Sequence, residues 1–377
     1  MTLLPLKQQP QIDKQCYHRR QEDHARFSFT IPLLESDDDG TASDDFSEQI
    51  SHLPQELIDQ FQKDGFAVFR DVISTDAVAA LNDGLEDVLR GDFDRGRKPD
   101  KVPKRIKSNK PQPSHENLIL ESSVSSTNDS DSRTTNNKCK AKVKKKSSGI
   151  GPIGFSGNLD NVKVLQIINI HKANSLFRKL ETSPILALVV SRLAGWERFG
   201  GARLAQDQVW AKPPGAPPLV FHRDSPYFMF EPTDVVTVWL ALDDMDDELG
   251  PLEYVVGSQL WGDGRVGSAN QFFQADTTSL LRSAAEREGI DPSTLEFVSM
   301  GGLKRGGLSI HHGKIWHGSA KNSSRNKPRR GLGLHFVPAN VRFTASASKS
   351  RLWKSYISNV EDPSKAKLSE EDFPLSI

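Results

Sequence analysis

The sequence has few cysteines and no long apolar run. Its two cysteines, Cys16 and Cys139, lie in polar stretches without metal-site spacing, so we expect neither a disulfide framework nor a cysteine zinc site. This scarcity is typical of a reducing compartment, and we expect an intracellular, cytoplasmic protein. No run of about 18 apolar residues occurs, which argues against a membrane-spanning helix. The short apolar start does not resemble a secretory signal, and the ending at Ile377 does not match a peroxisomal Ser-Lys-Leu signal.

The chain also lacks net charge, because 49 Lys and Arg residues balance 49 Asp and Glu residues. We therefore expect no nucleic-acid partner and no attraction to anionic membranes. Only 36% of the 377 residues are hydrophobic, which is low for a fully packed chain and predicts unstructured segments. Residues 1–50 lack a sustained apolar period, so we predict a disordered tail that precedes a single domain over residues 51–377.

A basic, low-complexity insertion interrupts this predicted domain at about residues 98–150. Residues 98–146 contain 13 Lys or Arg against 5 Asp or Glu, and residues 122–137 are rich in Ser, Thr and Asn. The basic run that ends at Lys146 is compatible with a nuclear-localisation or polyanion-binding segment. A solvated surface loop between core elements is the simpler interpretation, and both stay open.

The rest of the chain has an all-β pattern preceded by helical patterns. Short runs of β-type residues, broken by Gly, Pro and Asp, fill residues 201–338. The clearest predicted strands are residues 208–210, 235–242, 308–310 and 331–337, and the clearest helices are residues 57–61, 78–89 and 185–193. Many short strands joined by turns indicate a sandwich or barrel, here with helices in front of it.

One short motif carries the candidate chemistry. A single residue separates His222 from Asp224, so on a strand both side chains would point to the same face. His317 follows 95 residues later and could complete a set of two imidazoles and one carboxylate. Such a facial triad is typical of non-haem Fe(II), because it leaves metal positions open for a bidentate cosubstrate and for O2. Either histidine considered alone is more often structural, because His-x-Asp pairs are common by chance.

Two other pairs of residues bear on this hypothesis. Arg329 and Arg330 could hold the distal carboxylate of 2-oxoglutarate, which favours a planar, bidentate, permanently charged partner. The alternative is that both arginines are charges on a solvent-facing strand edge. His311 and His312 compete with His317 as ligands, and either could instead face the substrate or form a hydrogen bond to a metal ligand.

Several motifs, taken in order, resemble the phytanoyl-CoA dioxygenase family of Fe(II)- and 2-oxoglutarate-dependent oxygenases. The resemblance covers most of the chain from about Leu53 to Phe373, apart from the basic insertion. Its motifs are residues 64–69 (Asp-Gly-Phe-Ala-Val-Phe), 212–215 (Lys-Pro-Pro-Gly), 222–224, 250–258, 317–319 with Asn322, Arg329, and 370–374. Together these motifs are specific, because chance agreement in this order is improbable.

The resemblance implies a mainly β fold with flanking helices, namely a double-stranded β-helix, or cupin-like jelly roll. The implied Fe(II) ligands are His222, Asp224 and His317, and the implied cosubstrate is 2-oxoglutarate, with ascorbate as a candidate reductant. The residues that match the family's cosubstrate pocket are Arg329, Ser319, Trp239, Gln208 and Gln166. The spacing from His317 to Arg329 is one residue longer than expected, so Arg330 is an alternative to Arg329.

The resemblance further implies a dioxygenase that hydroxylates a small-molecule substrate with O2 and releases succinate and CO2. A lipid-like substrate of the acyl-CoA type ranks slightly ahead, because Phe228, Met229 and Phe230 could line an acyl pocket, although they could equally be core residues. Two other functions stay open. One is a non-catalytic binding protein on the same fold with a vestigial metal site, and the other is a zinc hydrolase, although no His-Glu-x-x-His-like motif occurs.

Overall fold

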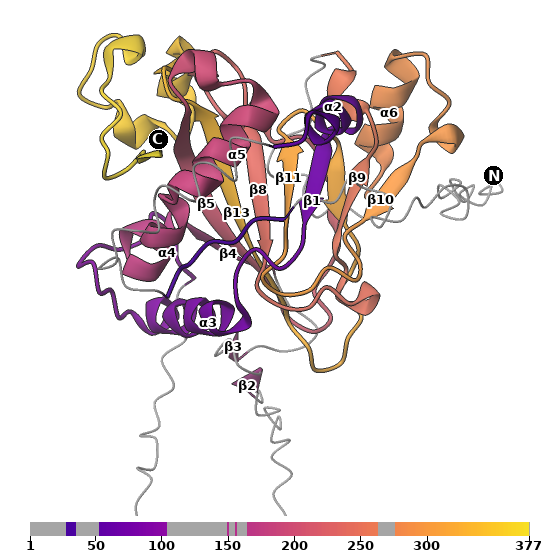
Figure 1. The fold of residues 1–377 in the computed structure, drawn as a ribbon, viewed down its shortest axis with the longest axis horizontal. Coiled ribbons are helices and arrows are strands. Elements are labelled where there is room, and N and C mark those ends of the chain that lie inside the picture. Colours follow the sequence, from indigo (N-terminus) through magenta and orange to yellow (C-terminus); the bar gives the residue numbers. More distant parts are fainter. Residues whose placement is uncertain are drawn as a thin grey trace, which may run out of the picture.

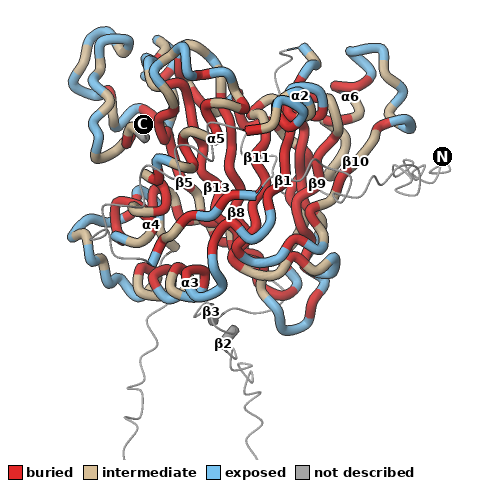
Figure 2. Tube along the Cα trace, viewed as in Figure 1, coloured by how far each residue is buried: buried red, intermediate tan, exposed pale blue. Residues whose placement is uncertain are grey.

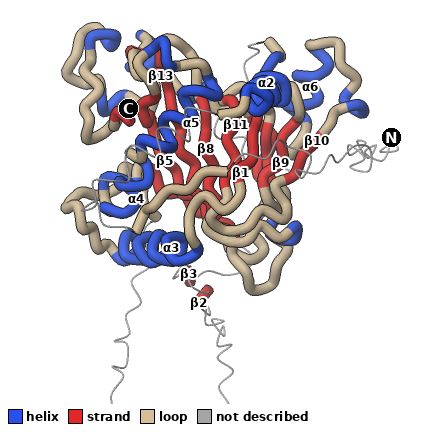
Figure 3. The backbone as a smooth tube through the Cα atoms, viewed as in Figure 1, coloured by secondary structure: helices blue, strands red, loops and turns tan. Residues whose placement is uncertain are grey.

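The structure, a computed structural model, is built around two antiparallel β-sheets with helices at its periphery (Figures 1 and 3). It describes residues 28–34, 53–103, 149–150, 155–156, 164–262 and 276–376. Within these ranges the protein is mainly β with flanking helices, as the sequence predicted. No helix in the described ranges is both long and apolar enough to cross a membrane.

The larger sheet has seven antiparallel strands and contains the four clearest strands that the sequence predicted. Their order is β1 (Phe66–Phe69), β11 (Leu308–His312), β8 (Val236–Ala241), β13 (Arg329–Pro338), β5 (Ala202–Lys212) and β15 (Leu375–Ser376), and β4 (Leu165–Ile168) also pairs with β5. The long β13 lies between β8 and β5, so its side chains occupy the middle of the sheet.

The smaller sheet packs against the inner face of the larger one. Its strands are β10 (Phe297–Ser299), β9 (Leu252–Val255), β12 (His317–Ser319) and β6 (Leu219–His222), in that order. The stacked rings of Phe66 and Tyr254, with centroids 4.9 Å apart, join the two sheets. Trp239 and Ile315 belong to the same buried apolar cluster. This pair of facing sheets matches the predicted jelly roll.

The opposite face of the larger sheet is covered by helices, and β13 shows how the sequence separates the two faces. Leu332, Leu334 and Phe336 are buried in one core cluster with residues of the helices. The alternate residues Gly331 and His335 therefore point to the inner face, toward the smaller sheet. The covering helices are α2 (Gln55–Asp64), α3 (Thr75–Arg90), α4 (Ser175–Glu181) and α5 (Pro184–Ala194), and Figure 2 shows the buried sheets beneath them.

The helix boundaries follow their capping residues. The Ser74 side chain accepts a hydrogen bond from the backbone N–H of Ala77 and begins α3. Gly91 and Gly195 end α3 and α5 with φ of 96° and 68°, a left-handed conformation that glycine adopts without strain. The remaining α-helix and strands of the described residues are α6 (Ser279–Arg287), β2 (Gly149–Ile150), β3 (Phe155–Ser156), β7 (Phe230–Glu231) and β14 (Arg342–Phe343).

The prediction of a disordered tail does not hold for residues 28–34, because their apolar side chains belong to the core. Phe29, Ile31 and Leu33 are at most 6% exposed, and the Ile31 N–H donates to the Val72 carbonyl at 2.8 Å. Three alternating apolar residues are too short a signal to distinguish from chance in a polar sequence. The rest of the tail, and most of the predicted insertion, lie outside the described residues.

Candidate active site

The three predicted metal ligands converge at the edge of the smaller sheet. His222 is the last residue of β6, and His317 is the first residue of β12 and its register partner. Asp224 is not on a strand, contrary to the sequence-based reasoning. It adopts a helical conformation at the start of a short 3-10 turn, and the Gly313 carbonyl accepts hydrogen bonds from its N–H and that of Ser225. A turn, and not strand alternation, therefore brings Asp224 to the histidines.

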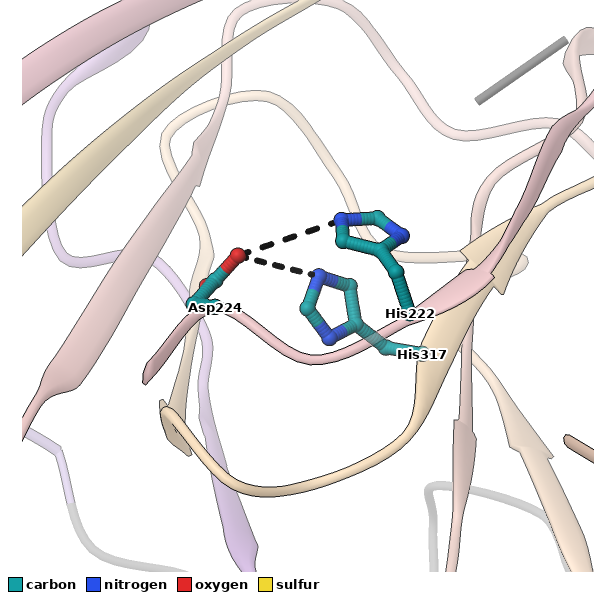
Figure 4. Close-up of side chains that lie close together, drawn as sticks. All are labelled: His222, Asp224 and His317. Carbon is teal, nitrogen blue, oxygen red and sulfur yellow. Dashed lines mark ion pairs between the residues drawn. The ribbon is translucent and has the colours of Figure 1, made fainter. Parts of the chain in front are cut away.

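The ligand atoms are close enough to share one ion (Figure 4). Asp224 Oδ1 lies 3.8 Å from His222 Nε2 and 3.7 Å from His317 Nε2, and the two imidazole ring centroids are 4.3 Å apart. The three ligand atoms all lie within 4.8 Å of one another. The site is therefore compact, with two nitrogens and one oxygen directed at a common point.

Hydrogen bonds orient both imidazoles. His222 Nδ1 lies 2.9 Å from the Val220 carbonyl oxygen, and His317 Nδ1 lies 3.1 Å from the Ile315 carbonyl oxygen. A carbonyl only accepts, so each Nδ1 carries the proton and each Nε2 presents a lone pair toward Asp224. Burial lowers the pKa of His222 to about 4 and that of His317 to about 4. Both rings are therefore neutral at neutral pH, as metal ligation requires.

The second oxygen of Asp224 is held by His311 and by Thr237, which the sequence did not single out. Asp224 Oδ2 accepts from Thr237 Oγ1 at 2.7 Å and from His311 Nε2 at 3.2 Å. His311 Nδ1 is 3.0 Å from the hydroxyl of Tyr254, and Thr237 Oγ1 is 2.9 Å from His335 Nδ1. Burial raises the pKa of the Asp224 carboxyl, but His317 and the His311 hydrogen bond hold that pKa well below its usual value.

His311 thus takes the supporting role that was one of its predicted alternatives, and His312 does not reach the triad. His312 Nδ1 accepts from the Lys314 N–H at 3.0 Å, and its Nε2 lies 3.7 Å from Asp234. Thr237 and Tyr254 could not be found from the sequence, because each is one of many polar residues in a β-type run and gains meaning only from register.

The two adjacent arginines of β13 differ sharply. Arg330 forms a bidentate ion pair with Asp243, with nitrogen–oxygen distances of 2.9 and 2.6 Å. Arg329 is 1% exposed, and its guanidinium carbon lies 5.7 Å from the centre of the Trp239 ring. Its Nε and Nη2 have no hydrogen-bond partner among the described residues. Arg329 therefore has donors available for a carboxylate, whereas Arg330 is already paired.

Ser319 shares a strand with His317 and bonds to Lys212, the register partner of Arg329. It is two residues after His317 on β12, so the two side chains share a face about 6–7 Å apart along the strand. That separation is comparable with the length of a 2-oxoglutarate chain. Ser319 Oγ accepts from Lys212 Nζ at 2.6 Å, and the Ala320 carbonyl also accepts from Lys212 at 2.6 Å. The sequence assigned Lys212 only to a family motif and gave no sign of its burial.

Gln166 and Gln208 occupy the same inner face but bond chiefly to one another. Gln166 Nε2 donates to Gln208 Oε1 at 2.6 Å, and Gln208 Nε2 donates to Gln206 Oε1 at 2.6 Å. Lys101 Nζ donates to Gln166 Oε1 at 2.7 Å. Gln208 is the register partner of Gly333 on β13, the strand that also carries Arg329 and Gly331. Its contact with a cosubstrate, and that of Gln166, stays a prediction.

A second group of potential ligands lies on the other face of the larger sheet. His171, Glu181 and Asp207 are fully buried, and His171 Nδ1 is 2.5 Å from Asp207 and 3.2 Å from Glu181. Burial lowers the pKa of His171, but the bonds to Asp207 and Glu181 outweigh it and raise that pKa to about 9. Asp207 also accepts from the Ile170 N–H at 2.8 Å. This cluster joins α4 to β5 through the contacts of His171 with the two carboxylates.

The donor set of the first cluster fits the implied metal and cosubstrate. Two neutral imidazole nitrogens and one carboxylate oxygen are the ligands expected of a non-haem Fe(II) facial triad. The unpaired guanidinium nitrogens of Arg329 are buried donors of the kind that native proteins rarely leave without a partner. A carboxylate bound between the triad and Arg329 would satisfy them.

Comparison with known proteins agrees with this geometry. A family model described as phytanoyl-CoA dioxygenase (PhyH) matches residues 61–331. Among solved structures, the epimerase SnoN from nogalamycin biosynthesis, in complex with Fe3+, alpha ketoglutarate and nogalamycin RO, superposes with a TM-score of 0.55 at 17% identity, covering 86% of this chain and 98% of that one. The carbocyclase SnoK from the same biosynthesis gives a TM-score of 0.53 at 18% identity, covering 87% and 98%. These likenesses support the double-stranded β-helix fold. No curated protein sequence matches the chain.

Proposed function

Because this chain belongs to the phytanoyl-CoA dioxygenase family of non-haem iron, 2-oxoglutarate-dependent oxygenases, we propose that it hydroxylates a small-molecule substrate at the site formed by His222, Asp224 and His317. The proposal rests on the ligand set and on one buried arginine. The three ligand atoms converge on one point at the smaller sheet, and Arg329, a buried arginine with unpaired donors, lies on the larger sheet that faces it. A metal triad and a carboxylate anchor on two facing sheets are what a chelating 2-oxo acid requires.

The residues divide the work between metal binding and cosubstrate binding. His222 and His317 offer neutral nitrogens to Fe(II), and Asp224 offsets part of its charge. Arg329 and Ser319 hold the distal carboxylate of 2-oxoglutarate, and Trp239 packs on the guanidinium. Iron bound there with 2-oxoglutarate and O2 would supply the oxidising chemistry that hydroxylates a C–H bond, with succinate and CO2 as co-products. The protein contributes ligand geometry, charge and exclusion of water.

An acyl-CoA type of substrate has its support in the family's name, and we retain it as the first class to assay. Of the residues considered for an acyl pocket, Phe228 and Phe230 pack with Trp353 in a buried aromatic cluster, so they are core residues. The solved structures named above are enzymes of nogalamycin biosynthesis, so a small molecule related to nogalamycin is a second class to screen. A reducing intracellular compartment would keep the iron ferrous.

The test is succinate formation from 2-oxoglutarate by the Fe(II)-loaded protein without added substrate. Slow uncoupled turnover is expected in the wild type and none in His222→Ala, because one imidazole nitrogen is lost from the metal. His312→Ala is the matched control, since His312 lies near the site but outside the triad. Its succinate rate should equal that of the wild type. Equal rates in the wild type and His222→Ala would contradict the proposal.

A further inference from the structure

A buried hydrogen-bond network links the smaller sheet to the carboxylate ligand of the triad. Tyr254 lies on β9, and its hydroxyl is 3.0 Å from His311 Nδ1 and 2.7 Å from Ser309 Oγ, both on β11 of the larger sheet. On the other side of the His311 ring, Nε2 lies 3.2 Å from Asp224 Oδ2. Tyr254, His311 and Ser309 are each at most 1% exposed, so bulk water does not compete for these bonds.

The chemistry of these groups gives each hydrogen bond a direction. A carboxylate only accepts, so His311 Nε2 carries a proton and donates it to Asp224. Burial lowers the pKa of His311, so the ring is neutral and its Nδ1 accepts from the Tyr254 hydroxyl. The Tyr254 oxygen in turn accepts from Ser309 Oγ. Tyr254 therefore selects the His311 tautomer that donates to Asp224.

Tyr254 is itself held in place by the framework that carries the metal ligands. It is the register partner of His317 across β9 and β12. Its ring centroid lies 5.0 Å from that of His311 and 6.2 Å from that of His317, and the Phe66 ring stacks on it at 4.9 Å. A side chain whose position is fixed by packing in this way is suited to orient another group.

We propose that Tyr254 is a positioning residue of the metal site, which acts through His311 to make Asp224 bind the metal through one oxygen only. The inference rests on the proposed function. Asp224 Oδ2 accepts from both Thr237 and His311, so its lone pairs are engaged and only Oδ1 is left for a metal ion. A carboxylate bound through both oxygens would occupy a metal position that the cosubstrate and O2 need.

The test is the Fe(II) affinity of Tyr254→Phe, measured without O2 by competition with a chelator. This variant keeps the ring that stacks on Phe66 and removes only the hydroxyl. We expect its Fe(II) affinity to fall about tenfold, the lower end of the loss typical for outer partners of metal ligands. Tyr356→Phe is the matched control, because the Tyr356 hydroxyl accepts from Lys172 Nζ at 2.9 Å in a network that does not include the triad. Its iron affinity should equal that of the wild type.

A double-variant cycle tests whether Tyr254 acts through His311. We expect His311→Leu to lower Fe(II) affinity about 10- to 100-fold. Adding Tyr254→Phe to it should change the affinity by less than about twofold, because the bond that transmits the effect is already lost. A merely structural effect of the Tyr254 hydroxyl would persist in the double variant. Ser309→Ala serves if His311→Leu does not fold, and it should weaken iron binding in the same direction as Tyr254→Phe.

The inference and the proposed function fail in different ways. Wild-type Fe(II) affinity in Tyr254→Phe or in Ser309→Ala would overturn the inference and leave the iron site intact. Losses that multiply in the double variant would do the same, because they would show that Tyr254 and His311 act independently. A wild-type protein that binds no Fe(II) would overturn both.

Discussion

Replacing Thr237 by valine removes one hydroxyl group from beside the proposed iron ligands and conserves the shape of the side chain. Thr237 Oγ1 donates to Asp224 Oδ2 at 2.7 Å and lies 2.9 Å from His335 Nδ1. A hydroxyl has a single proton, so with that proton on the carboxylate its oxygen accepts from His335 Nδ1. Thr237 is 2% exposed, so bulk water does not replace the lost bonds.

The size of the effect follows from these two bonds. A hydrogen bond to a charged group contributes about 1.5–3 kcal/mol, and a buried donor left unsatisfied costs about 1–3 kcal/mol. The free energy of unfolding of the metal-free Thr237→Val protein should therefore fall by about 2.5–6 kcal/mol. A carboxylate that loses an outer partner typically loses about 10- to 100-fold in metal affinity. We expect Fe(II) affinity to fall within that range, because Asp224 can then rotate away from His222 and His317.

Fe(II) affinity is measured without O2 by competition with a chelator, and stability is measured by urea denaturation. Thr182→Val is the matched control, because Thr182 Oγ1 donates to the Arg178 carbonyl at 2.9 Å beyond the end of α4, away from the triad. The control should lose stability without losing iron affinity. Wild-type iron affinity in Thr237→Val would refute the idea that this hydroxyl holds Asp224 in place.

Three other perturbations have defined outcomes. The triad imidazoles have a pKa of about 4 in the folded chain against about 6.5 when unfolded, so the unfolded chain binds more protons between those values. Stability of the metal-free protein should fall from pH 6.5 to 4 by up to about 3 kcal/mol per imidazole, as urea titrations across pH would show. The pKa of His171 is raised to about 9, so the folded chain keeps this proton above pH 6.5 and stability should fall again from pH 6.5 to 9. His171→Asn should flatten the decrease in stability over that alkaline range. An unchanged decrease in this variant would contradict the buried ion pair. Gly331→Ala would place a methyl group 2.4 Å from Trp239 Cζ2 and should lower the free energy of unfolding by about 1–3 kcal/mol. It should also weaken the binding of 2-oxoglutarate, measured by calorimetry. Gly333→Ala is the control, because its methyl group would meet nothing closer than 3.7 Å, and it should resemble the wild type.

Much of the fold was predictable because the signals were local. The alternation of Leu332, Leu334 and Phe336 with small or polar residues defines two faces of one strand, and the structure buries the apolar face under helices. Ser74 and Gly91 delimit a helix through capping, which depends only on neighbouring residues. The segment at residues 28–34 was missed because its burial depends on a distant partner, Val72.

The site was predictable only in part, for the same physical reason. His222, Asp224 and His317 were recognisable by residue type and spacing, and the structure brings them together. The choice between Arg329 and Arg330 needed the position of Asp243, which lies more than 80 residues away in the sequence and pairs with Arg330. The roles of Thr237 and Tyr254 depend on strand register, which single-residue patterns do not encode.

The most direct test of the central claim is whether Fe(II) and 2-oxoglutarate bind to one connected site. Calorimetric titration of 2-oxoglutarate into the wild-type protein, without O2, is compared in the presence and absence of Fe(II). The chelating end of the acid would bind the metal held by His222, Asp224 and His317 while its distal carboxylate binds Arg329. We therefore expect an affinity for 2-oxoglutarate at least about tenfold higher with iron, because each ligand strengthens the binding of the other. An affinity for 2-oxoglutarate that iron leaves unchanged would contradict it.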